Sequence, residues 1–196
     1  MQTATLAPEP VRTRLFTAAE YYRMGEIGIF GPEERVELIE GHITLMSPIN
    51  APHATAVRRL HKQLFRQLDG RYEIDVQSTL NLTEASQPEP DATVLRPFDE
   101  SKVPALKDVQ IVIEVSDSTL RLDQTTKLRM YAAAGVPEYW IVNLKQRQIE
   151  VYTRPEGSRY ADQTIYAADD TARSATVENL NVRVADLMIG TEGAER

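Results

Sequence analysis

The 196-residue chain contains no cysteine. This absence excludes disulfide bonds, thiolate zinc sites and cysteine nucleophiles, and it is compatible with a reducing compartment. No apolar run approaches the roughly 20 residues that a membrane-spanning helix needs. The opening sequence MQTATLAPEPVRTR also lacks the apolar segment of a secretory signal. We therefore expect a cytoplasmic protein that makes no contact with a membrane.

Several common catalytic patterns are missing as well. The chain has no phosphate-loop glycine pattern and no dinucleotide-binding fingerprint. Ser116 and Ser118 have no histidine and acid arranged as a hydrolase triad requires. The three histidines, His42, His53 and His61, do not have metal-ligand spacing. Nucleotide-dependent chemistry and triad hydrolysis are therefore disfavoured.

The composition is that of one ordinary globular domain. Hydrophobic residues make up 42% of the chain and charged residues 26%. We expect a flexible N-terminal tail over residues 1–14, a single domain over 15–190 and a C-terminal tail over 191–196. The net charge of −7 argues against a broad basic surface. A local basic cluster remains, for which a solvated helix face is the simpler interpretation: Arg58, Arg59, Lys62 and Arg66.

Hydrophobic periodicity and turn residues predict the order of the elements. Thr17 and Glu20 form a capping box that begins a short helix, which Gly25 ends. Apolar residues alternate around Glu40 and Gly41, as in a β-hairpin. The later elements are a helix over 51–70, strands over 71–82, 91–96 and 109–116, a helix over 124–134 with Asp123 as N-cap, and strands over 138–143 and 147–153. This order predicts a mixed α/β (α+β) fold, with an N-terminal hairpin and a central sheet flanked by helices.

The strand over 109–116 carries a carboxylate that such a strand rarely contains. Strand period places Val112, Glu114 and Ser116 on one face. An unpaired buried charge costs several kcal/mol, so Glu114 needs a partner. Asp91 begins the preceding strand, and if the two strands are neighbours the carboxylates converge. Two close carboxylates repel unless a proton or a metal lies between them, and Mg²⁺ suits such a pair.

A lysine lies on the apolar face of the helix that follows this strand. Lys127, Met130, Tyr131 and Ala134 share one face at helical spacing. A lysine among residues that pack on a sheet implies an anionic partner, for which the two carboxylates are candidates. Two simpler interpretations stand beside this one. Lys127 could pair only with Asp123 at i, i+4 spacing, and Glu114 could lie at an exposed strand end.

Five ordered segments resemble a known family. They read RVELIEG, SPINAPH, PEPDATV, IVIEVSDST and DQTTKLRMYAAAGVPEYWIV. Together they resemble the PD-(D/E)XK nuclease superfamily, and within it the bacterial "putative restriction endonuclease" family formerly catalogued as a domain of unknown function. The resemblance covers residues 16–152 and implies a restriction-endonuclease-like central mixed sheet. The chain departs from the superfamily pattern at Ser116, where a lysine is usual, and Lys127 resembles a migrated replacement.

The resemblance also implies a reaction and the residues that carry it. Asp91 and Glu114 would bind Mg²⁺, or Mn²⁺ as a substitute, with the Val115 carbonyl as a further ligand. Lys127 would position or deprotonate the attacking water and stabilise the phosphate. The implied substrate is DNA, and cleavage of two strands is compatible with a homodimer. We expect Lys127 to matter far more for catalysis than for stability.

The same resemblance implies three supporting residues, of which Glu37 and His53 each have a simpler alternative. Glu37 is an additional acid of the site or a solvated hairpin glutamate. His53 contacts phosphate or supports the site, or it makes only a local hydrogen bond at the start of a helix. Gln77 lines the site. The alternatives to a nuclease are a noncatalytic member of the fold that binds or regulates, and a metal-binding structural protein.

Overall fold

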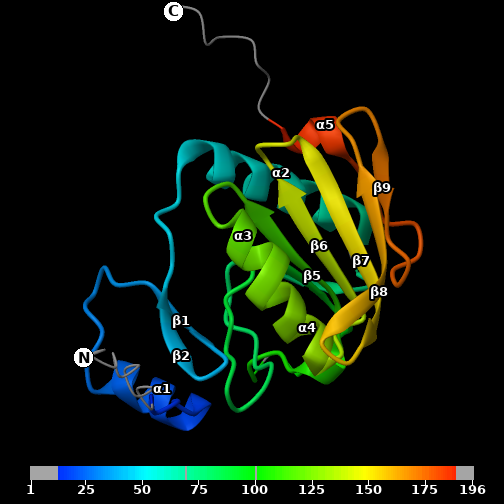
Figure 1. Cartoon of the computed structure of the whole chain (residues 1–196). Coiled ribbons are helices and arrows are strands. Elements are labelled where there is room, and N and C mark those ends of the chain that lie inside the picture. Colours follow the sequence, from blue (N-terminus) through cyan, green and yellow to red (C-terminus); the bar gives the residue numbers. More distant parts are fainter. Residues whose placement is uncertain (1–12, 69, 100, 189–196) are drawn as a thin grey trace, which may run out of the picture.

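The computed structural model describes residues 13–68, 70–99 and 101–188. The tail expected over 191–196, and residues 1–12 of the tail expected over 1–14, lie outside this range. Within it, no helix is long and apolar enough to cross a membrane. A six-stranded sheet forms the centre of the molecule, and its strands lie in chain order (Figure 1). The strands are β3 (Glu73–Asp75), β4 (Ala92–Leu95), β5 (Val109–Ser116), β6 (Glu138–Asn143), β7 (Gln148–Glu156) and β8 (Arg159–Tyr166).

Strand directions make this a mixed sheet. Only β5 and β6 pair in parallel, and the other neighbouring strands pair antiparallel. The parallel step needs a crossover connection, which the helical segment between β5 and β6 provides. This segment consists of α3 (Leu120–Leu122), the π-helix η2 (Asp123–Lys127) and α4 (Leu128–Ala134). The architecture confirms the predicted mixed α/β fold.

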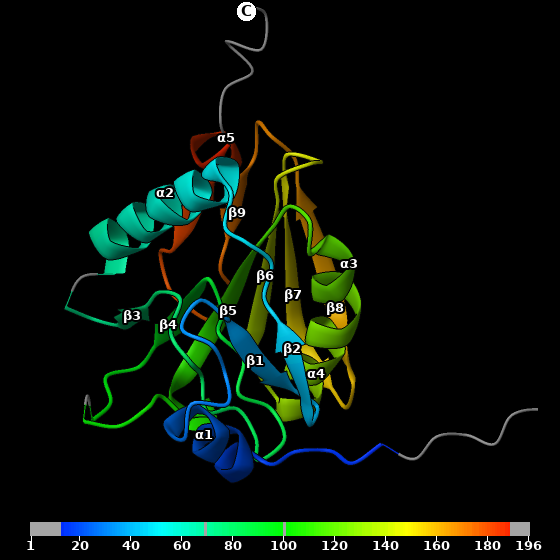
Figure 2. The same ribbon diagram turned by 90° about the vertical axis from the view of Figure 1, so that its left-hand side faces the viewer.

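Helices cover both faces of the sheet, with β5 buried between them (Figure 2). Ile111, Ile113 and Val115 pack in the core cluster that contains the apolar stripe of α2 (Ala51–Leu68). Val112 packs in the second cluster, with Met130 and Tyr131 of α4. A strand buried on both faces favours apolar β-branched residues, which explains why five of the eight residues of β5 are valine or isoleucine. The predicted alternation of β5 is confirmed.

Smaller elements complete the fold. The predicted hairpin forms as β1 (Val36–Ile39) and β2 (His42–Leu45), and Glu40 and Gly41 turn it with positive φ angles of 48° and 79°. The capping box of Thr17 and Glu20 begins helix α1 (Ala18–Glu26). The remaining elements are η1 (Leu106–Asp108), β9 (Thr171–Arg173), β10 (Asn181–Arg183) and α5 (Val184–Leu187).

Three predicted elements differ from those observed. The first helix, which Gly25 was expected to end, continues through Gly25 to Glu26. The strand expected over 71–82 is limited to Glu73–Asp75, because Gln77 adopts a positive φ of 49° that interrupts the extended backbone. The helix expected from residue 124 begins at Leu120 instead. Asp123 is therefore inside the helical segment and is not its N-cap. Gly135 ends the segment in the left-handed conformation, as predicted.

Adjacent residues of α2 give a matched test of the core. Leu64 is fully buried against the sheet, whereas 56% of Phe65 is exposed. Leu64→Ala should lower the free energy of unfolding by about 2–5 kcal/mol, through lost burial and the cavity that remains. Phe65→Ala should change it by no more than about 0.5 kcal/mol. Urea denaturation of both variants measures the difference, and equal losses would contradict this placement of α2.

Candidate active site

The two predicted metal-binding carboxylates lie on neighbouring strands. Ala92 of β4 is opposite Ile113 of β5, so Asp91 reaches the sheet beside Glu114. Asp91 Oδ2 accepts a 2.8 Å hydrogen bond from the backbone N–H of Val115. Both carboxylates line one cavity, and only 4% of Glu114 is exposed. The interpretation of Glu114 as an exposed strand-end residue is therefore wrong.

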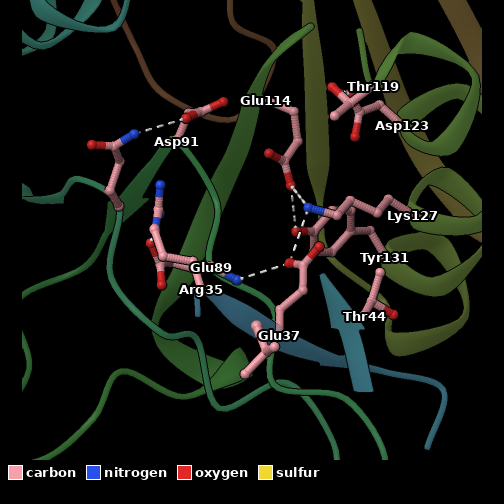
Figure 3. Close-up of polar contacts among 12 residues, drawn as sticks. Arg35, Glu37, Thr44, Glu89, Asp91, Glu114, Thr119, Asp123, Lys127 and Tyr131 are labelled. Atoms are coloured by element: carbon pink, nitrogen blue, oxygen red, sulfur yellow. Dashed lines mark hydrogen bonds and ion pairs between the residues drawn. The ribbon is translucent and has the colours of Figure 1, made fainter. Parts of the chain in front are cut away.

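Lys127 points into the same cavity from η2 (Figure 3). Its ammonium lies 3.0 Å from Glu114 Oε1 and 3.1 Å from Glu37 Oε2, and its side chain is almost fully buried. The prediction that Lys127 points into this cavity is confirmed, and of its two expected partners it pairs with Glu114, while its second ion pair is with Glu37. The alternative, a surface pair with Asp123, is wrong: Asp123 Oδ2 accepts hydrogen bonds from Ser116 and Thr119, each 2.7 Å long.

Glu37 belongs to this group rather than to the solvated surface. It comes from β1, only 3% of it is exposed, and its Oε2 also accepts a 3.3 Å hydrogen bond from the backbone N–H of Glu89. The interpretation of Glu37 as a solvated hairpin residue is therefore wrong. The hairpin thus supplies the second carboxylate that holds Lys127.

Tyr131 completes the surroundings of Glu114, although the sequence indicated only a packing role for it. Its hydroxyl donates a 2.9 Å hydrogen bond to Glu114 Oε1, the oxygen that Lys127 also contacts. The other carboxylate oxygen of Glu114 points toward the side of the cavity where Asp91 lies (Figure 3). The signal in the sequence was the position of Tyr131, one helical turn after Lys127 on the same face.

Burial and charge together set the protonation of the site. Burial raises the pKa of Glu114 to about 8, against the opposing charge of Lys127, and Asp123, Asp91 and Glu37 raise it further. Burial alone would lower the pKa of Lys127, but the carboxylates of Glu114 and Glu37 outweigh it and raise that pKa. Lys127 is therefore a permanent cation, surrounded by more buried acids than its single charge neutralises.

His53 and Gln77 both bond to Asp91. His53 Nε2 lies 3.0 Å from Asp91 Oδ2, and Gln77 Nε2 donates to Oδ1 at 3.3 Å. Burial lowers the pKa of His53, but its hydrogen bond to Asp91 and the charge of that residue raise it above the ordinary value. His53 therefore does more than make a local hydrogen bond, because it orients a carboxylate from a distant strand. Its Nδ1 is buried and has no hydrogen-bond partner in the described part of the chain.

The end of the β4–β5 ladder exposes a backbone carbonyl to the site. The N–H of Val115 points toward Asp91. In an antiparallel pair the N–H and C=O of one residue point to the same side, so the Val115 carbonyl also faces this side, where β4 has not yet begun. Asp91, Glu114 and this carbonyl offer the hard oxygen ligands that Mg²⁺ prefers.

The cavity has room for a hydrated ion. Its volume is about 90 Å³, and one water molecule needs roughly 10–15 Å³ of such space. No group of three or more His, Asp and Glu side chains in the described ranges could hold a metal ion by itself. Mg²⁺ commonly takes one or two carboxylates and several waters, so two carboxylates and a carbonyl fit it.

The buried contacts of Lys127 give it a larger structural role than we expected from the sequence. Lys127→Met leaves Glu37 and Glu114 buried without their cation, which should cost about 3–5 kcal/mol of folding free energy. The loss should grow as pH rises from about 7 to about 9.5. Lys127 lowers the pKa of Glu114, which is about 8 when the lysine is present, so the folded variant keeps the Glu114 proton to higher pH than the folded wild type. Both proteins lose stability as pH rises toward about 8, and only the variant continues to lose it above that value.

Urea denaturation of the wild type and Lys127→Met at both pH values measures this effect. The control is the double variant Glu114→Gln/Lys127→Met, which has one buried charge fewer and should recover part of the loss at high pH. A loss that does not change with pH, or a double variant no more stable than the single one, would contradict the assignment.

Comparisons with known proteins agree with this geometry. The family model described as "Uma2: Putative restriction endonuclease" matches residues 18–185. A crystal structure of "a putative nuclease belonging to DUF820" from Anabaena variabilis ATCC 29413 has the same fold, with a TM-score of 0.68, 15% sequence identity, and coverage of 88% of this chain and 97% of that one. No curated protein matches the chain. The match confirms the resemblance seen in the sequence: the chain belongs to the Uma2 family of putative restriction endonucleases.

Proposed function

We propose that the protein is a magnesium-dependent endonuclease that hydrolyses phosphodiester bonds of DNA. The observation that carries this proposal is the convergence of Asp91, Glu114 and Lys127 in one cavity from β4, β5 and η2. Membership of a family described as restriction endonucleases supports the reaction class. A cytoplasmic location and action as a homodimer are parts of the same proposal.

Each ligand of the proposed ion has a defined support. Asp91 and Glu114 would hold Mg²⁺, or Mn²⁺ in its place, together with the Val115 carbonyl. His53, Gln77 and the N–H of Val115 fix the orientation of the Asp91 carboxylate. A bound divalent ion supplies Lewis-acid chemistry: it lowers the pKa of a coordinated water and offsets the charge of the phosphate.

Lys127 acts through its charge. The neighbouring carboxylates raise its pKa, so the amine does not accept a proton at neutral pH. Of the two roles that the resemblance implies, positioning the attacking water and stabilising the phosphate therefore fits better than deprotonating the water. Contacts with Glu37 and Glu114 hold the ammonium at the cavity before substrate binds, which avoids reorganisation during the reaction.

A noncatalytic binding protein is the second candidate, and one contact favours it. Ser116 stands where the superfamily has its lysine, and its hydroxyl donates to Asp123. The charge that acts on phosphate then comes from Lys127 alone, which two carboxylates already neutralise in part. A protein that binds metal and DNA but does not cleave is the outcome this candidate predicts.

Plasmid cleavage tests the proposal. Wild-type protein should nick or linearise supercoiled DNA with Mg²⁺ or Mn²⁺ and not with EDTA. Glu114→Ala should lower the rate by on the order of 10²–10³, as loss of a preorganised electrostatic contact typically does. Lys127→Ala should also lose most activity, and it is assayed well below its unfolding temperature.

Glu150 provides a matched control. It is also a buried glutamate on the central sheet, but Gln124, Asn143 and Tyr152 satisfy it outside the cavity. Glu150→Gln should cleave at the wild-type rate. Wild-type protein that binds the metal yet cleaves no DNA or RNA supports the noncatalytic candidate, and equal rates for wild type and Glu114→Ala contradict the site.

A further inference from the structure

Helix α2 differs in charge from the rest of the molecule. Its 18 residues include four cations and no acid, in a chain with a net charge of −7. The four cations, Arg58, Arg59, Lys62 and Arg66, are all exposed. Because α2 has cations and no acid, it offers a local positive surface for an anionic partner on a protein that is acidic as a whole.

The cations of α2 are also not neutralised within the protein. Among the described residues, no ion pair joins any of these four cations to a carboxylate. Nine cations elsewhere in the described chain do form such pairs. Arg58 bonds to the hydroxyl of Thr55 and Arg59 to the carbonyl of Met188, and both contacts leave the positive charge uncompensated. Within the described ranges six further cations also lack an ion pair with a carboxylate: Arg71, Arg96, Arg121, Lys145, Arg173 and Arg183. What distinguishes α2 is that four such cations lie on one helix that contains no acid.

The spacing of the cations suits a chain of phosphates. Arg58, Lys62 and Arg66 follow one another at i, i+4 spacing, which lines them along one side of the helix at intervals of about 6 Å. Phe65 lies beside this line and is 56% exposed. A cationic line with an exposed ring is the combination by which proteins hold single-stranded nucleic acid, through phosphate contacts and base stacking.

The helix begins at the candidate active site. His53, in its first turn, contacts Asp91, and Asn50, just before it, donates to Asp117 in the same cavity. From there α2 extends away from the site along one face of the sheet (Figure 2). A nucleic-acid strand held at the cavity can therefore continue along α2.

We infer that the exposed face of α2 binds the phosphate backbone of the nucleic acid on which the site acts. Arg58, Lys62 and Arg66 contact successive phosphates, and Phe65 stacks on a base between them. The inference rests on the proposed function for the identity of the partner. It explains why four unpaired cations and no acid lie on the one long helix that begins at the cavity.

The salt dependence of binding tests this surface without requiring cleavage. Each phosphate contact with a single strand contributes about 0.7 to the slope of log K against log salt. In a Glu114→Gln background with Mg²⁺, the triple change Arg58→Ala/Lys62→Ala/Arg66→Ala should make the slope shallower by about 2 and weaken binding at least about tenfold at low salt. Fluorescence anisotropy with a labelled single-stranded oligonucleotide measures both quantities.

A second triple variant controls for net charge. Arg23→Ala/Arg154→Ala/Arg159→Ala also removes three exposed cations and should keep the original slope. Equal effects of the two variants, an unchanged slope, absence of oligonucleotide binding, or an α2 variant that alters only the oligomeric state would overturn the inference. If binding depends on α2 but the wild type never cleaves plasmid, the proposed function fails and the surface stands. If the wild type cleaves plasmid but the α2 triple variant binds the oligonucleotide as the wild type does, the inference about α2 is wrong and the proposed function stands.

Discussion

The contact of one buried ammonium with two buried carboxylates holds the candidate site together. Lys127 comes from the π-helix, Glu114 from the central strand and Glu37 from the N-terminal hairpin. The helical segment follows the central strand in the chain, whereas the hairpin is far from both in sequence. Burying each charge alone would cost several kcal/mol. The three elements must therefore meet in one arrangement for any of these charges to be satisfied, and this requirement fixes the hairpin and the helix over the same end of the sheet.

This arrangement leaves an excess of negative charge. Glu37, Asp91, Glu114 and Asp123 are buried around a single lysine. Burial, and to a smaller extent the three neighbouring acids, raise the pKa of Glu114. The remaining hydrogen bonds orient the acids without neutralising them, apart from the histidine beside Asp91. Under the proposed function the metal and the phosphate therefore depend on each other, because the bound ion would reduce this negative charge before phosphate approaches.

Much of the site could be predicted because two charges interrupt apolar patterns. A glutamate inside the run VQIVIEVS and a lysine on an apolar helix face each signal a buried partner. Strand and helix periods are local, so they place both side chains on the faces that the structure shows. The fold class followed from the order of the elements for the same reason, since that order depends mainly on local signals.

The features that the sequence left open or missed all depend on contacts between distant segments. Glu37 reads as a polar residue of a hairpin, and its burial follows only from the position of that hairpin against β5 and η2. Asp123 has the sequence signature of an N-cap, but Ser116 on the preceding strand and Thr119 satisfy it inside the helical segment. Gln77 interrupts a strand that alternation predicted, since it adopts a positive φ and its side chain donates to Asp91. None of these outcomes can be read from local spacing.

Direct metal binding tests the central claim, that the buried acids around Lys127 hold a divalent cation. Mn²⁺ binding can be followed by electron paramagnetic resonance in the wild type, in Asp91→Asn and in Glu150→Gln as a control. The account predicts that each chain binds one Mn²⁺ ion and that Mg²⁺ displaces it. Asp91→Asn should weaken Mn²⁺ binding by at least about tenfold, as loss of a metal-site residue typically does. Glu150→Gln should bind Mn²⁺ as the wild type does. Wild-type protein that binds no Mn²⁺, or Asp91→Asn protein that binds it as tightly as the wild type, would contradict the account.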